Sequence, residues 1–161
     1  MIKLFETFNE YSQVKEWLDK VGVENYTIND DLTVDVNDNV NICHSDLWEI
    51  PIQFGRIYGN FDCGHNNLTT LKGCPIYVEE SFACTYNKLH SLLYTPKYIG
   101  YRFYYGSNPL PSKLNDFNVP MAVYKYQEEY GIWNVDGSFN LSRWNMFIED
   151  YEAGILDIEE N

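Results

Sequence analysis

The sequence contains no long apolar run and few basic residues. Its 161 residues include 11 Lys and Arg against 24 Asp and Glu, which gives a net charge of −13. No stretch approaches the ~20 apolar residues that a membrane-spanning helix needs, so we expect no membrane association. The first residues, MIKLFETFNEYSQ, lack the apolar core of a signal peptide. We therefore predict a cytoplasmic location, where the four cysteines are free thiols.

The motifs of common enzymes are also missing. There is no G-x-S-x-G, no H-E-x-x-H and no glycine-rich phosphate loop. Cys43, His44 and His65 form the one group that resembles a metal site, but their spacing matches no standard zinc pattern. We predict that the protein is not an enzyme and that it uses no cofactor and no metal.

The charge is distributed unevenly along the chain. Residues 1–38 carry nine acids and three bases, and residues 112–161 carry ten acids and three bases. Residues 39–111 have five of each and are neutral. Direct binding of nucleic acid requires a basic surface, so this distribution argues against it.

A repeat of 21 residues dominates the middle of the chain. The stretch NFDCGHNNLTTLKGCPIYV, from Asn60, returns as SFACTYNKLHSLLYTPKYI, from Ser81. A fixed period of this length indicates a stacked array of coils. Three full units and the start of a fourth cover residues 39–111. The matched positions are Phe61 with Phe82, Cys63 with Cys84, Asn66 with Asn87, Leu68 with Leu89, Leu71 with Leu92, Pro75 with Pro96 and Val78 with Ile99.

The residues of one unit predict its local structure. Residues 61–63 alternate apolar, polar and apolar, which predicts a short strand with one buried face. Asn66 breaks this alternation, and its amide suits a turn where backbone groups need partners. Stacked units should form a parallel ladder with Cys63 and Cys84 pointing into a shared core, while Cys74 falls in a loop and is expected at the surface.

The order of these residues resembles the leucine-rich repeat, L-x-x-L-x-L-x-x-N-x-L. Phe61 and Cys63 take the places of the strand leucines, and Asn66 that of the asparagine. The short period and the proline are similar to the bacterial kind of this repeat. The lead-in YTINDDLTVDVN and the NLTTLKGCP units also resemble uncharacterised proteins of large tailed bacteriophages. The first unit departs from the pattern, with Ser45 in place of Asn and Phe54 in place of Pro.

The flanks predict closing elements for the array. Apolar residues at helical spacing predict a helix over residues 8–18, and residues 26–28 and 32–36 read as a hairpin. Residues 119–130 and 140–151 predict two further helices. The expected fold is therefore one α/β domain: a short leucine-rich-repeat solenoid (39–111) with a parallel β-ladder, an N-terminal helix-plus-hairpin cap (1–38) and a C-terminal helical cap (112–161).

Leucine-rich repeats serve mainly as binding scaffolds, so the resemblance implies a protein-binding module. A phage-encoded inhibitor of a host defence or regulatory protein, acting in the host cytoplasm, is the function this suggests. The exposed side of the ladder supplies the candidate partner-binding residues: Asp62, His65, Tyr86, Arg102 and Tyr104.

Two alternatives remain open at this point. The acidic flanks could imitate a nucleic-acid backbone and block the basic groove of a nucleic-acid-binding protein. The protein could also be a homo-oligomeric structural component that pairs through Trp133 or Trp144. The sequence does not fix the oligomeric state or the partner.

Overall fold

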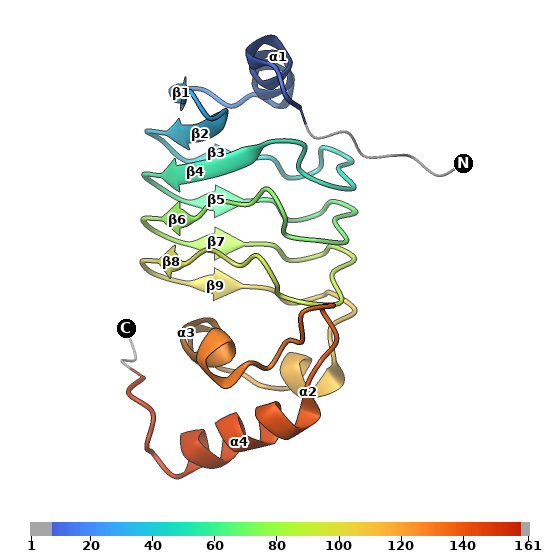
Figure 1. Ribbon diagram of the computed structural model, residues 1–161, viewed down its shortest axis with the longest axis vertical. Coiled ribbons are helices and arrows are strands. Elements are labelled where there is room, and N and C mark those ends of the chain that lie inside the picture. The colour runs from blue at the N-terminus through green and yellow to red at the C-terminus, as the bar shows by residue number, and fades with distance from the viewer. Residues whose placement is uncertain (1–7, 159–161) are drawn as a thin grey trace, which may run out of the picture.

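The protein folds as a β-solenoid of about three coils with helices at both ends (Figure 1). This computed structural model describes residues 8–158. α1 lies at one end of the stack, and α2, α3 and α4 lie at the other. The elements are α1 (Tyr11–Val21), β1 (Tyr26–Ile28), β2 (Thr33–Val36), β3 (Val40–Asn41), β4 (Gln53–Ile57), β5 (Phe61–Asp62), β6 (Tyr77–Val78), β7 (Phe82–Ala83), β8 (Tyr98–Ile99), β9 (Phe103–Tyr104), α2 (Ser112–Asn115), α3 (Pro120–Tyr130) and α4 (Leu141–Glu152).

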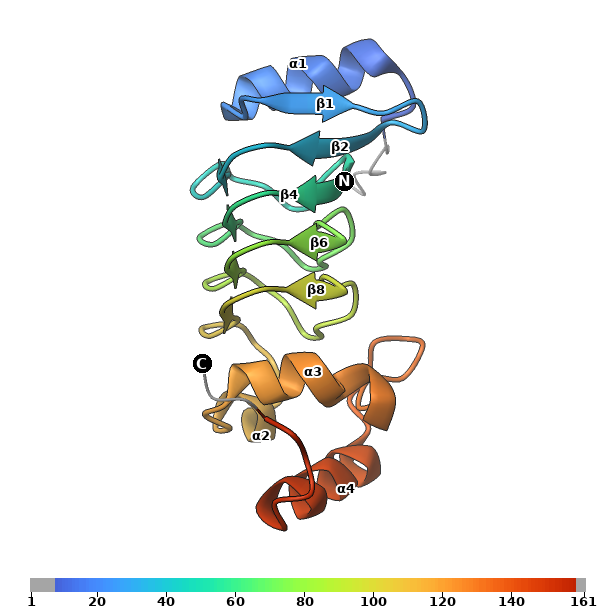
Figure 2. The same cartoon turned by 90° about the vertical axis from the view of Figure 1, so that its left-hand side faces the viewer.

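Two ladders run along the stack where the sequence predicted one. The predicted ladder is a four-stranded parallel sheet in the order β3-β5-β7-β9. The second is a five-stranded sheet in the order β1-β2-β4-β6-β8, in which only β1 and β2 are antiparallel. Figure 2 shows β4, β6 and β8 stacked on the side of the molecule that faces the viewer. Each coil therefore contributes one strand to each sheet.

The strand register reproduces the sequence period. Phe61 pairs with Phe82, and Phe82 pairs with Phe103. In the second sheet Ile57 pairs with Val78, which pairs with Ile99. Each step is 21 residues, so equivalent side chains of successive coils lie in columns that run along the stack.

The core is built from these columns. Phe54, Phe61, Phe82 and Phe103 are at most 2% exposed. The rings of Phe61 and Phe82 are 5.8 Å apart, and those of Phe82 and Phe103 are 5.7 Å apart. Such neighbouring aromatic pairs add about 0.5–1.5 kcal/mol each beyond the area that they bury.

A ladder of buried asparagines holds the turns together. The amide nitrogen of Asn87 donates to the carbonyl oxygens of Cys84, in its own coil, and of Cys63, in the coil before. Its amide oxygen accepts from the Leu68 N–H at 3.0 Å. Asn66 and Asn108 repeat this arrangement. The asparagine thus satisfies backbone groups that the turn would otherwise leave buried without partners.

The ends of the stack are covered by helices. α1 buries Val14, Trp17 and Leu18, and the Trp17 ring lies 6.2 Å from Phe54 in the first coil. The helix begins three residues later than its spacing predicted and ends where Gly22 takes a left-handed conformation, with φ of 77°. At the other end α3 packs against β9, and α4 packs against α3.

Candidate functional site

The five candidate residues lie on one side of the β3-β5-β7-β9 sheet. Asp62 belongs to β5 and Tyr104 to β9, and Arg102 immediately precedes β9. His65 and Tyr86 occupy the turns that follow β5 and β7. We call this set of residues (Asp62, His65, Tyr86, Arg102 and Tyr104) the ladder face. Four of them are exposed, and Asp62 is half-buried.

His65 and Tyr86 form a stacked pair. Their ring centroids are 4.4 Å apart with the planes 10° from parallel. His44, one coil earlier, stacks on His65 at 4.6 Å. All three residues have a left-handed backbone, with φ between 52° and 54°. This backbone conformation is energetically unfavourable for residues other than glycine. The turn therefore holds the three rings in one column at a cost in backbone energy.

Arg102 and Tyr104 form a second cluster on the last strand. A guanidinium nitrogen of Arg102 lies 3.4 Å from the Tyr104 hydroxyl, and its charge lies 4.9 Å from the ring centre of Tyr101. The hydrogen bond to Tyr104 is the main cause of a raised pKa at Arg102. The guanidinium group is held close to two aromatic rings, an arrangement common in protein interfaces.

Asp62 is tied into the turn of its own coil. Its carboxylate accepts a hydrogen bond from the Gly64 N–H at 2.8 Å. Burial, and next the neighbouring Asp62, raise the pKa of the Cys43 thiol to about 12. Asp62 therefore supports local structure and has less freedom to meet a partner than the other four residues.

The structure groups the ladder face into two parts. His65 and Tyr86 are in contact, and so are Arg102 and Tyr104. Asp62 and Tyr104 share a column but are two strands apart, which corresponds to roughly 10 Å. A single partner surface can therefore reach both parts.

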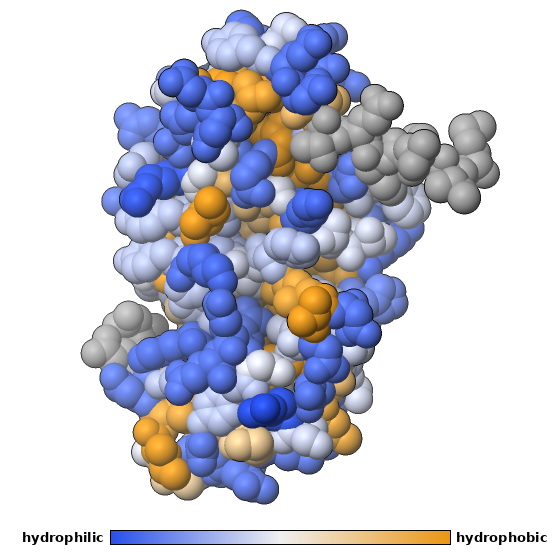
Figure 3. Space-filling model, in the orientation of Figure 1, coloured by the Kyte–Doolittle hydropathy of each residue, from blue (hydrophilic) through white to orange (hydrophobic). Residues whose placement is uncertain are grey.

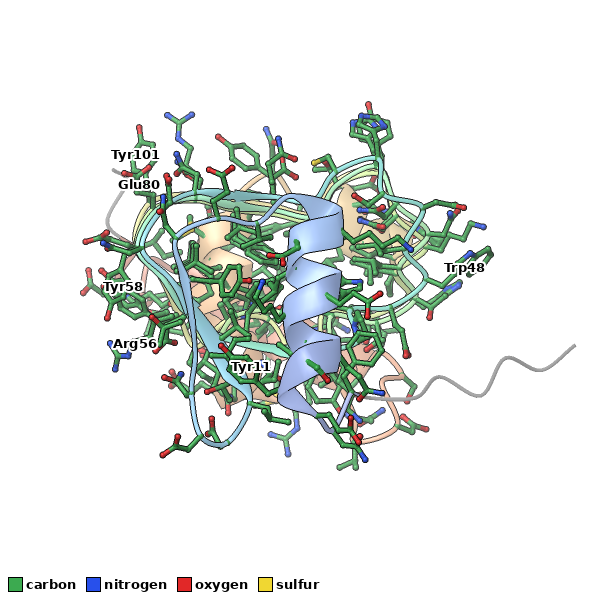
Figure 4. The ribbon with its side chains drawn as sticks, turned by 90° about the horizontal axis from the view of Figure 1, so that it is seen from above. Tyr11, Trp48, Arg56, Tyr58, Glu80 and Tyr101 are labelled. Carbon is green, nitrogen blue, oxygen red and sulfur yellow. The ribbon has the colours of Figure 1, made fainter. Side chains whose placement is uncertain are left out.

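The second sheet carries a comparable face that the sequence analysis missed. The Tyr77 and Tyr98 rings stack at 4.6 Å with planes 9° apart, and the Arg56 charge lies 5.1 Å from the Tyr77 ring. Figure 4 shows Arg56 and Tyr58 on this side, with Glu80 and Tyr101 at the corner between the sheets and Trp48 on the opposite side. The repeated order of an outward residue followed by a buried aliphatic one, at positions 56–57, 77–78 and 98–99, was the available signal.

The cysteines confirm one prediction and correct another. Cys63 and Cys84 are both buried, as predicted, and all four cysteines are free. Cys74 is only 3% exposed, so its expected place at the surface was wrong. The loop that carries it turns into the core. Within residues 8–158, no three His, Cys, Asp or Glu side chains lie close enough together to hold a metal ion.

The tryptophans named for self-association differ in their surroundings. Trp144 is 3% exposed and packs edge-on against Phe117 at 5.5 Å. Trp133 is half-buried, and its indole nitrogen donates to Gln127 at 2.9 Å. Of the two, Trp133 alone reaches the surface.

The surface of the described residues has no single large apolar face in the view of Figure 3, where the most hydrophobic residues form separate patches. None of the described helices combines the length and the apolar character that crossing a membrane requires. No protein-family model matches the chain, and comparisons with curated proteins and with solved structures gave no match.

Proposed function

We propose that the protein is a non-enzymatic binding module that docks its ladder face against another protein. The observation that carries this proposal is the column of rings that continues from His65 to Tyr86, next to the Arg102 and Tyr104 cluster. Tyr and Arg are the residues most often found at the energetic centre of protein interfaces. Because the backbone ladder already fixes them, little conformational entropy is lost on binding.

More specifically, we propose that the protein belongs to the short leucine-rich-repeat proteins. The order of strand, inward asparagine and buried leucines within each coil supports it. From the resemblance to phage proteins we propose that the partner is a bacterial defence or regulatory protein, that binding inhibits it, and that this occurs in the bacterial cytoplasm.

The test is capture of a partner from a bacterial lysate by the tagged protein, read by mass spectrometry. The double variant Tyr86→Ala/Tyr104→Ala removes the two tyrosine rings of the ladder face, which are 56% and 41% exposed. The matched control is Tyr77→Ala/Tyr98→Ala, which removes a stacked pair from the second sheet. We expect the control and the wild type to capture the same protein and the Tyr86→Ala/Tyr104→Ala variant to lose it.

Two results would contradict this assignment. Loss of the partner only in the Tyr77→Ala/Tyr98→Ala variant would move the site to the second sheet. Capture of the partner by both variants would show that these tyrosines of the two sheets do not form the interface.

The charge distribution supports a second candidate function. The two ends carry net charges of −6 and −7 around a neutral array. Such ends could occupy the basic groove of a nucleic-acid-binding protein. In this case the affinity for the captured partner should fall steeply between about 50 and 200 mM salt, as nucleic-acid binding does. The ladder-face interaction, which depends on aromatic contacts, should change little.

A further inference from the structure

The two sheets end differently where the array meets the C-terminal helices. β8 is the last strand of its sheet, and a side chain of α3, Tyr124, hydrogen-bonds to its free edge. β9 is the last strand of the other sheet, with α2 and α3 beyond it (Figure 1). Among residues 8–158, no group forms hydrogen bonds of this kind with the free edge of β9.

This edge carries backbone groups that are paired in the two coils before it. In each of those coils three N–H groups at alternate positions donate to carbonyl oxygens of the next coil: those of Phe61, Cys63 and His65, and those of Phe82, Cys84 and Tyr86. The equivalent N–H groups of Phe103, Tyr105 and Ser107 have no acceptor among residues 8–158. The Phe103 carbonyl oxygen has no donor there either. The edge therefore presents the alternating donors and acceptor with which a neighbouring strand pairs.

The outer side of this edge is open. Its three outward residues are exposed, whereas their equivalents one coil earlier are half-buried: Arg102, Tyr104 and Gly106 against Ser81, Ala83 and Thr85. At Gly64 an added Cβ would lie 3.1 Å from the carbonyl oxygen of Thr85 in the next coil. At Gly106, two coils later, an added Cβ would meet nothing within 4 Å. The space that a further coil would occupy is therefore free beside the end of β9.

The inner side of the same edge is filled. The Phe103 ring packs edge-on against Tyr124 of α3, with the ring centres 6.5 Å apart. The Tyr105 hydroxyl donates to the Leu114 carbonyl oxygen in α2 at 3.4 Å. A strand that pairs with β9 can therefore turn only small side chains, such as alanine, towards the core.

Arg102 gives the open edge a positive charge. It ends the column of Asn39, Asn60 and Ser81, in which a side chain reaches the backbone of the next coil, as Asn60 does at 3.0 Å from the Ser81 N–H. Arg102 is exposed and makes no ion pair among residues 8–158. A strand beside β9 would place an outward side chain next to the guanidinium group, and a carboxylate there would be complementary to it. Because residues 39–111 carry no net charge, the array does not repel a single carboxylate.

We propose that the edge of β9 binds an extended segment of the partner protein as an added strand. The segment turns small residues towards the core and carries an acidic residue beside Arg102. This inference rests on the proposed function and adds to it the kind of segment that the partner supplies. Backbone hydrogen bonds provide the affinity and the side chains provide the specificity, as in other proteins whose sheets are extended by a peptide.

The test uses the peptide acetyl-TAEATAT-amide, in which alanines alternate with polar residues and the glutamate is placed to lie beside Arg102. The full-length protein is titrated with it, and binding is followed by NMR spectroscopy. Hydrogen exchange of the Phe103 and Tyr105 amides is measured with and without the peptide. Because these N–H groups would gain acceptors, their exchange should slow at least about tenfold at saturation. Exchange of the Phe82 amide, which is already paired, is the internal control and should change less than about twofold.

Two further changes separate the backbone contribution from the charge. N-methylation of the threonine in register with Tyr104 removes the N–H that would donate to the Phe103 carbonyl oxygen, so the affinity should fall at least about tenfold. Arg102→Glu should lower the affinity for the peptide at least about fivefold, and acetyl-TAKATAT-amide should bind this variant as the first peptide binds the wild type. Arg56→Glu, at an exposed arginine of the second sheet, is the matched control and should leave the affinity unchanged.

Three results would overturn the inference. The first is no binding of the peptide by the wild type at millimolar concentration. The second is equal affinity for the N-methylated and the unmodified peptide, which would exclude an added strand. The third is protection of the Phe103 and Tyr105 amides that rises with protein concentration in the absence of peptide, which would assign the edge to a second copy of this chain.

Failure of this inference can be told apart from failure of the proposed function. If the peptide does not bind but Tyr86→Ala/Tyr104→Ala still loses the captured partner, the ladder face remains the docking site and the edge of β9 is not part of it.

Discussion

The hydroxyl group of Tyr124 completes the open edge of β8 by accepting a hydrogen bond from the Ile99 N–H at 2.9 Å. It also donates to the Lys97 carbonyl oxygen at 3.1 Å. In the earlier coils these positions are served by the next strand. One side chain of α3 therefore replaces a missing coil, and burial raises the pKa of its hydroxyl further above neutral pH.

Removing this hydroxyl should weaken the junction between the array and the C-terminal helices. Tyr124→Phe leaves two backbone groups at the edge of the sheet without their partner. We expect a loss of about 1–2 kcal/mol in the free energy of unfolding, measured with urea. Tyr98→Phe, on an exposed ring of the same sheet, is the control and should change stability by less than about 0.5 kcal/mol. Equal effects of the two variants would show that the edge does not need this hydroxyl.

The buried asparagine ladder should contribute more to the free energy of unfolding than the Tyr124 hydroxyl does. Asn87→Ala removes both donors and the acceptor that serve Cys63, Cys84 and Leu68. Because these backbone groups would stay buried without partners, we expect a loss of about 3 kcal/mol in urea unfolding.

Asn67→Ala provides the comparison for Asn87→Ala. Among residues 8–158, the Asn67 side chain bonds only to the exposed carboxylate of Asp46. It should cost less than about 1 kcal/mol. A mild effect at Asn87 would mean that water replaces the amide in the turn.

Substitution by alanine should lower stability at one glycine and leave it nearly unchanged at another. Gly73 has φ of 93°, and an added Cβ would lie 2.5 Å from the Ile52 carbonyl oxygen. Gly106 has nothing within 4 Å of an added Cβ. We expect Gly73→Ala to cost about 2–4 kcal/mol and Gly106→Ala to change stability by less than about 0.5 kcal/mol, both measured by thermal unfolding. The prediction fails if the two variants melt together.

Alkaline pH should destabilise the protein through Cys43. Its pKa is raised from an ordinary value of 9.0 to about 12, so the folded state keeps the proton that the unfolded state loses. The contribution is therefore fully present below pH 9 and is lost as the pH rises towards 12. The difference in urea midpoint between wild type and Cys43→Ala should shrink over this range. A constant difference between pH 8 and pH 11 would exclude the mechanism.

The features that follow directly from the 21-residue repeat could be predicted from the sequence. The columns of Phe61 and Phe82 and of Asn66 and Asn87 follow from the period, and their burial follows from stacking. The second sheet was missed because β6 and β8 each hold one buried aliphatic residue, Val78 or Ile99, without the apolar, polar, apolar alternation that marked residues 61–63. The burial of Cys74 was not predicted for a different reason, because it depends on how a loop turns over the core.

The candidate site was predicted to a smaller extent. The stacking of His65 on Tyr86 follows from their shared column. The role of Asp62 in its own turn and the open edge of β9 depend on three-dimensional contacts. The Tyr124 side chain that closes β8 lies outside the repeat, so no pattern in the sequence shows which edge stays open.

The in-register pairing of Phe61, Phe82 and Phe103 has a consequence for the length of the protein. Every coil presents the same backbone edge and the same column of side chains to its neighbour. The two ends therefore fit a stack of any height, and the chain can grow or shrink by whole blocks of 21 residues. Duplication of one block would lengthen the ladder face by a strand without requiring a new helix at either end.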